Sequence, residues 1–304
     1  MLLLIAVLLI LVVVVISYIC FRIAFYTSRK EIYGEFDIPK GKIYEPYRDI
    51  MIKWMKEVKG SEKENFTIKS FDGLNLTAKY YECKKGAPIE LMLHGYRGNA
   101  QRDLCGGVQR CFSLGHNAFI VDQRACGNSE GHIISFGINE KRDCLYWIDF
   151  IISHFGSDVK IILTGISMGA STVLMASGEK LPENVIGVLA DCGYSTAEEI
   201  IKKTIKEMKL PVFLSYPFVR LGAFLYGGFD INKCRPVDAV KKAEIPIIYF
   251  HGTNDDFVPH YMSEQCYSCT ASRKKLVLIK DSGHGLSYLK DTEAYLKELS
   301  DFFC

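Results

Sequence analysis

Short apolar runs, separated by longer stretches of helical periodicity, recur from residue 88 to the end of the chain. Their hydrophobicity is continuous rather than alternating, which is typical of strands buried on both faces of a sheet. Helical crossovers between such strands produce a parallel sheet. The sequence therefore predicts an α/β fold with strands in PIELMLHG, AFIVDQR, VKIILTG, VIGVLADCG, IPIIYFHG and KKLVLIKDSG.

The region before these runs predicts a different start to the sheet. FTIKSF and LNLTAKYY alternate apolar and polar residues on either side of Asp72-Gly73, which is a strong hairpin signal. Further upstream, EPYRDIMIKWMKEV has amphipathic spacing and predicts a helix that packs on the domain. We expect an antiparallel hairpin to precede the parallel strands.

The first 21 residues carry no charge. Because 20 helical residues span about 30 Å, the thickness of the hydrocarbon core, we predict a transmembrane helix at 1–21, a juxtamembrane segment at 22–61 and a globular domain at 62–304. A cleaved signal peptide is the main alternative, but no basic region precedes the run and no small-x-small site follows it. A lipid-attachment role for Cys20 is disfavoured by the bulky Tyr18 and Ile19 before it.

Charges and cysteines indicate the compartment. Arg22, Arg29 and Lys30 follow the apolar run, and only the terminal amine precedes it, so the positive-inside rule places the domain on the cytoplasmic side of the membrane. Eleven cysteines without framework spacing favour a reducing compartment. The net charge of +2, with both signs interspersed, argues against a nucleic-acid partner.

About 50 residues separate VLADCGY from IPIIYF, far more than a usual α/β connection. This insertion, about 195–243, opens with the capping-box pattern of Ser195 to Glu198. It continues with PVFLSYPFVRLGAFLYGGF, in which only Arg220 is charged. A second membrane span is one interpretation, but the prolines and glycines disfavour a regular lone helix. We predict a helical cap with an apolar underside.

Ser167 lies in Gly165-Ile166-Ser167-Met168-Gly169, between a predicted buried strand and a predicted helix. A sharp turn there needs glycines, because side chains at the flanking positions would collide with the neighbouring strand or helix. A serine hydroxyl is a poor nucleophile and needs a base, which in turn needs an orienting carboxylate. The motif predicts a nucleophilic serine held at the end of a strand.

Two later strand ends supply the partners of this serine. HGTNDDFVP follows IPIIYF, and SGHGLSY follows KKLVLIK, so both loops fall at the carboxyl edge of a parallel sheet. The predicted order is Ser167, then Asp255 or Asp256, then His284. The amides of Met168 and Tyr96 are the predicted oxyanion donors, since both follow strands at the same edge.

LHGYRGN, DQRACGNSEG, GISMGA, HGTNDDFVP and DSGHGLSY resemble the successive motifs of the α/β-hydrolase superfamily, in its serine aminopeptidase-like and monoglyceride lipase-like branch, over residues 62–304. The resemblance implies the α/β-hydrolase fold and, through H-G-x-x-D-x-x-V-P, makes Asp255 the acid and Asp256 the reserve candidate. One departure is Ala125-Cys126, where the family has Gly-His in a structural turn. Another is Tyr96 in place of a glycine-rich oxyanion turn.

These observations predict a membrane-anchored serine hydrolase that cleaves carboxylic esters through an acyl-enzyme. The apolar cap and the tether favour a small or lipid-like acyl ester as substrate. The mechanism needs no metal and no organic cofactor, and the lone pair Cys266 and Cys269 is a poor zinc motif. Two alternatives remain: an aminopeptidase or amidase with the same triad, and a catalytically silent, membrane-tethered binding protein.

Overall fold

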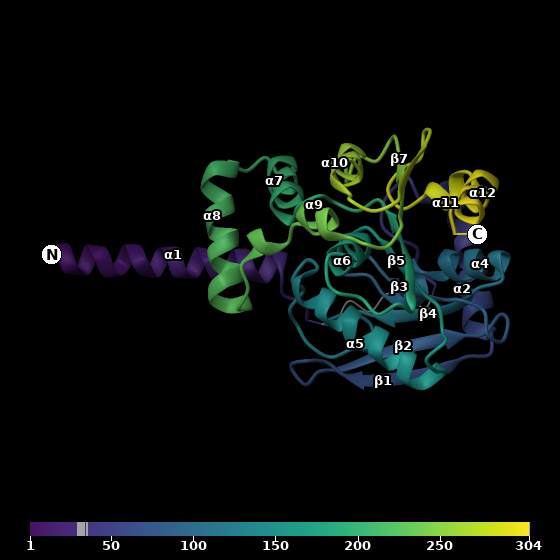
Figure 1. Ribbon diagram of the computed structural model, residues 1–304. Helices are drawn as coiled ribbons and strands as arrows, with labels where there is room; N and C mark the ends of the chain where they lie inside the picture. The colour runs from purple at the N-terminus through teal and green to yellow at the C-terminus, as the bar shows by residue number, and fades with distance from the viewer. Residues whose placement is uncertain (29–33, 35, 304) are drawn as a thin grey trace.

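The computed structural model describes residues 1–28, 34 and 36–303, and its centre is an eight-stranded sheet (Figure 1). The strand order is β1-β2-β4-β3-β5-β6-β7-β8. β1 pairs antiparallel with β2, and β2 pairs antiparallel with β4, while the remaining neighbours are parallel. The strands are β1 (Glu64–Lys69), β2 (Asn75–Tyr81), β3 (Ile89–Leu93), β4 (Asn117–Asp122), β5 (Ile161–Ile166), β6 (Val185–Asp191), β7 (Ile247–Gly252) and β8 (Lys274–Ile279).

Helices cover both faces of the sheet, as its continuous hydrophobicity requires. α5 (Ile138–Phe155), α6 (Met168–Ala176) and α10 (Tyr261–Cys269) bury one face around Trp147. α2 (Arg48–Gly60), α4 (Cys105–Leu114) and α12 (Thr292–Phe303) bury the other. The predicted α/β fold, its hairpin start and all six predicted parallel strands are confirmed. The short helices are η1 (Glu45–Tyr47), α3 (Ala100–Asp103), η3 (Ile231–Lys233), α9 (Pro236–Ala239), η4 (Val240–Lys242) and α11 (Ser287–Lys290).

The long connection after β6 is a helical cap. It contains α7 (Ala197–Glu207), α8 (Val212–Gly222) and the π-helical turn η2 (Ala223–Gly227). The helical part of the apolar stretch is Val212–Gly227, and the chain bends by 97° between it and Ile231–Lys242, so a second span made of these two segments would be a broken one. α8 crosses the N-terminal helix α1 (Leu2–Ala24) (Figure 1).

α1 is long and apolar enough to cross a membrane, and it extends three residues beyond the predicted 1–21. Its last turns are not separate from the globular part. Phe21 and Phe25 are buried in a cluster with Tyr216 of α8 and Met168 of α6, which we call the cap cluster. The predicted divisions at 21 and 61 stay predictions, and contacts cross both. Arg29 and Lys30, on which the predicted orientation partly rests, lie outside the described residues.

Candidate active site

Ser167 occupies the turn between the end of β5 and the start of α6. Its backbone has φ 56° and ψ −120°, a conformation that costs a non-glycine residue about 1–3 kcal/mol and that clusters at functional sites. The turn is possible because two neighbours lack side chains. A Cβ on Gly169 would lie 2.0 Å from the Leu93 carbonyl oxygen, and a Cβ on Gly165 would lie 2.2 Å from the Gly169 carbonyl carbon.

Three predicted residues form one hydrogen-bonded chain. His284 Nε2 lies 2.9 Å from Ser167 Oγ, and His284 Nδ1 lies 2.7 Å from Asp255 Oδ2. The residues follow β5, β7 and β8, so the parallel sheet brings them to one edge although 117 positions separate the serine from the histidine. With its proton on Nδ1, the imidazole donates to Asp255 and accepts from the serine hydroxyl.

Asp255 is buried and held on both carboxylate oxygens. Oδ1 accepts from the amides of Phe257 at 3.0 Å and Val258 at 2.8 Å, while His251 Nε2 lies 3.2 Å from Oδ2. Burial opposes the charge of the carboxylate, but the hydrogen bonds and charges of His251 and His284 outweigh it and hold the pKa of Asp255 below its ordinary value. Asp255 is therefore ionised beside the imidazole.

The reserve acid, Asp256, lies elsewhere. It is exposed, and its backbone carbonyl accepts from Lys203 of the cap. His251, at the end of β7, is buried under the acid loop. Its Nδ1 lies 2.7 Å from Ser263 Oγ and its Nε2 lies 2.7 Å from the Val258 carbonyl. Its contacts position Asp255 rather than Ser167.

The loop after β3 lies directly against the serine. A Cβ on Gly95 would be in van der Waals contact with Ser167, 3.5 Å from its Cβ, which puts the backbone of Tyr96 within the same turn. His94 is buried, and its Nε2 accepts from the Gln123 amide at 3.0 Å. The Gln123 side chain donates to the His94 carbonyl at 2.6 Å. Both ring nitrogens of His94 are thus engaged in holding this loop.

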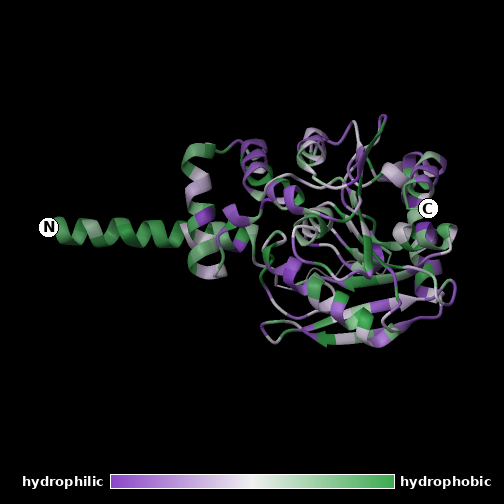
Figure 2. Cartoon of the chain, in the orientation of Figure 1, coloured by the Kyte–Doolittle hydropathy of each residue, from purple (hydrophilic) through white to green (hydrophobic). Residues whose placement is uncertain are grey.

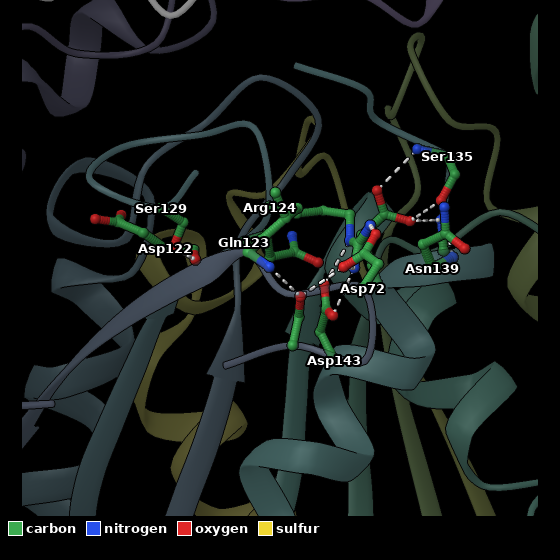
Figure 3. Close-up of polar contacts among 12 residues, drawn as sticks. Asp72, Asp122, Gln123, Arg124, Ser129, Ser135, Asn139 and Asp143 are labelled. Carbon is green, nitrogen blue, oxygen red and sulfur yellow. Dashed lines mark hydrogen bonds and ion pairs between the residues drawn. The ribbon is translucent and has the colours of Figure 1, made fainter. Parts of the chain in front are cut away.

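The turn after β4 is held by a polar network (Figure 3). Arg124 lies between Asp143, 2.6 Å from Nε, and Asp72, 2.9 Å from Nη1. Ala125 stands where the resembled family has glycine, and its φ of 64° is in the left-handed region. Cys126 is buried in the cap cluster, and burial raises the pKa of its thiol above the ordinary value. The departure at Ala125-Cys126 therefore lies in a structural turn.

Three contacts from the N-terminal segments were missed by the sequence reasoning. The Tyr44 hydroxyl donates to the His284 carbonyl at 3.1 Å, and the Tyr96 hydroxyl donates to the Ala24 carbonyl, at the end of α1, at 2.8 Å. Arg97 donates to the Ile23 carbonyl at 2.8 Å. Since the partners lie 72 to 240 positions apart, no local pattern could have revealed them.

A cysteine lies beside the hydrogen-bonded chain. Ligand atoms of Cys192, Asp255 and His284 fall within 4.8 Å of one another, which makes them a candidate metal group. Burial raises the pKa of the Cys192 thiol well above its ordinary value, whereas a metal needs the thiolate. The Asp255 and His284 atoms that could bind a metal already take part in hydrogen bonds with each other and with Ser167. These donors fit proton transfer better than metal binding.

No family model matches the chain. The uncharacterised Bacillus subtilis protein YqkD is 27% identical over 243 residues, which cover 79% of this chain and 79% of that protein. The uncharacterised Escherichia coli protein YfhR is 25% identical over 303 residues, which cover 94% of this chain and 93% of that protein.

Solved structures of similar fold include several hydrolases. The Pyrococcus furiosus esterase Pf2001 has a TM-score of 0.67 and 20% identity, over 89% of this chain and 97% of that one. Est1E of Butyrivibrio proteoclasticus, solved with ferulic acid, has a TM-score of 0.61 and 20% identity, over 78% of this chain and 98% of that one. The Pyrococcus horikoshii acylaminoacyl peptidase has a TM-score of 0.58 and 16% identity, over 82% of this chain and 43% of that one. Together with the sheet order, these likenesses show that the chain has the α/β-hydrolase fold.

Proposed function

We propose that this protein is a membrane-anchored serine hydrolase that cleaves carboxylic esters through an acyl-enzyme intermediate. The observation that carries the proposal is the chain from Ser167 Oγ through His284 to Asp255, with links of 2.9 and 2.7 Å. It joins a nucleophile, a base and an orienting carboxylate in the arrangement that activates a serine hydroxyl.

In the proposed reaction, His284 Nε2 removes the hydroxyl proton as Ser167 Oγ attacks the ester carbonyl. The amides of Met168 and Tyr96 donate to the developing oxyanion. His284 then gives its proton to the leaving alkoxide, and the carbonyl re-forms as the acyl-enzyme. Water, deprotonated by His284, attacks the acyl group and releases the acid. Asp255 keeps the imidazole in the required tautomer and stabilises its charged form.

The proposed anchor is α1, whose apolar length suits a bilayer. Its first charged residue is Arg22, close to the globular part, and this supports a cytoplasmic position for the hydrolase domain. An acyl ester with membrane affinity is the substrate class that suits an enzyme held at a bilayer. The acylaminoacyl peptidase among the structures of similar fold keeps amide hydrolysis as the second candidate.

Fluorophosphonate labelling of the wild type and of Ser167→Ala tests the nucleophile. We expect the variant to lose labelling and to lower kcat by about 10⁴- to 10⁶-fold with little change in Tm, since the substitution removes a single oxygen atom and its hydrogen bond to His284. Ser153→Ala, at an exposed serine of α5, is the matched control and should label fully. Retained turnover in Ser167→Ala would reject the assignment.

A substrate panel separates the two candidate activities. Nitrophenyl esters of graded acyl length and peptide anilides are compared by kcat/KM. Esters are expected to be the better substrates. Preference for anilides would favour the aminopeptidase or amidase, and absence of both labelling and turnover of either class would favour the silent binding protein.

A further inference from the structure

The cap and α1 are one packed unit. Gly222 of α8 approaches α1 so closely that a Cβ there would lie 2.4 Å from the Ser17 carbonyl oxygen. Beyond α8, the Tyr226 hydroxyl donates to the Val14 carbonyl at 3.0 Å. Ser17 and Phe21 are buried by these contacts. The level at which α8 crosses α1 is therefore fixed, between about Val14 and Phe21.

The free part of α1 is too short to span a bilayer by itself. Residues 2–13 precede Val14, whose carbonyl already accepts from Tyr226 of the cap, and 12 residues at 1.5 Å each cover about 18 Å, less than the roughly 30 Å of the hydrocarbon core. The helix reaches 30 Å only when the turns up to Phe21 are included, just before the charged Arg22. Because α8 packs on those turns, it must enter the membrane when they do.

The outer surface of this unit is apolar. Phe213, Leu214, Phe224 and Leu225, which we call the cap face, are exposed, with Phe213 at 84% and Phe224 at 64%. α1 is hydrophobic along most of its length, and α8, which crosses it, also carries hydrophobic residues (Figure 2). The stretch Val212–Gly227 contains one charged residue, Arg220, which pairs with Asp230. Apolar surface of this kind marks an interaction site.

We propose that the cap face lies in the membrane, at the boundary between headgroups and acyl chains, in the leaflet that contains the last turns of α1. The inference rests on the proposed membrane anchoring. A helix lying in the membrane plane buries its apolar side about 5–10 Å deep. With Arg22 at the edge of the hydrocarbon core, the segment from Val14 to Phe21, where α8 crosses α1, lies at about this depth. Tyr216 and Val219, on the inner side of α8, belong to the cap cluster with Met168. α8 therefore separates lipid from the candidate active site.

Quenching by brominated phospholipids tests the proposal on the full chain in phosphatidylcholine vesicles. Phe213→Trp and Phe224→Trp place a fluorophore on the cap face, and Ile10→Trp places one within the free part of α1. Leu278→Trp, at an exposed position of the edge strand β8, is the matched control. The unsubstituted chain, with its two tryptophans, gives the background.

We expect the fluorescence added by the cap-face tryptophans to be quenched at least half as strongly as that of Ile10→Trp, and that of Leu278→Trp to be unaffected. If Ile10→Trp is quenched while both cap-face variants behave like Leu278→Trp, the cap face is not in the membrane and the proposal falls although the anchor stands. If Ile10→Trp itself escapes quenching, both the anchor and the proposal fail. Hydrolysis of soluble esters, measured in parallel, reports on the proposed chemistry independently of either result.

Discussion

The candidate active site and the cap are held by different forces. Ser167, Asp255 and His284 follow β5, β7 and β8 of one sheet, whose strands are held in place by backbone hydrogen bonds. The cap and the end of α1 meet through aromatic packing, with Phe25 edge-on to Phe229 at 5.3 Å, and through a few bonds to helix carbonyls. The contrast teaches that the positions of the three candidate site residues depend on the sheet. The position of the cap above them depends on α1, which is far away in the sequence.

The largest expected effect separates the two acidic candidates at the sheet edge. Asp255→Asn should lower kcat on a nitrophenyl ester by about 10⁴-fold, because an amide NH₂ facing His284 stabilises the wrong tautomer. Asp256→Asn, at the exposed neighbour, should change kcat by less than twofold. Steady-state kinetics with Tm as a folding check decides the matter. Equal losses in both variants would overturn the assignment of the acid.

The next effect concerns the stability of the sheet. Glu90 of β3 is buried, forms an ion pair with Arg110 of α4, and accepts from Thr164 at 3.0 Å. Glu90→Gln leaves the guanidinium buried without its counter-charge, and we expect a loss of about 3–5 kcal/mol in the free energy of unfolding. Urea unfolding at neutral pH measures it. A loss below 1 kcal/mol would show that the pair adds little to the sheet.

The same pair predicts a pH dependence. Burial opposes the charge of Glu90, but Arg110 and His116 outweigh it and lower the pKa from 4.5 to about 2. The folded pKa lies below the unfolded one, so this stabilisation is complete above about pH 4.5 and is lost as the pH falls toward 2. The difference in stability between wild type and Glu90→Gln should therefore shrink across that window. A constant difference would contradict the assignment.

The contrast between the two regions also explains what the sequence could and could not predict. Strand hydrophobicity and the G-x-S-x-G turn indicate the sheet edge, and the order of strand ends suffices to name Ser167 and His284. The choice of Asp255 over Asp256 needs a family resemblance, since both residues lie in one loop. Tyr44 and Ala24 reach the site through contacts across the fold. These contacts depend on how α1 and the segment around Tyr44 pack on the domain, and no short sequence pattern predicts such packing.

A smaller effect tests the hydrogen bond between Tyr96, in the loop after β3, and the end of α1. Tyr96→Phe removes the hydroxyl that donates to Ala24 at 2.8 Å and keeps the ring. Since one hydrogen bond contributes about 0.5–1.5 kcal/mol, kcat should fall by up to about tenfold as the loop loses its position, with Tm little changed. Tyr146→Phe, at an exposed tyrosine of α5, is the control. Unchanged kcat would mean that the end of α1 does not position the loop.

An effect of similar size is expected as a difference in stability between two alanine-to-glycine variants. Ala125 has φ 64°, whereas Ala118 lies in β4, and both are buried. Replacement by glycine costs each a methyl group and about 0.4–1 kcal/mol through the freer unfolded chain. Only Ala125→Gly also relieves a left-handed backbone, which costs an alanine about 1–2 kcal/mol. Ala118→Gly should therefore destabilise by about 1–2 kcal/mol more than Ala125→Gly in urea unfolding. Equal losses of stability in the two variants would mean that the left-handed backbone of Ala125 stores no measurable strain.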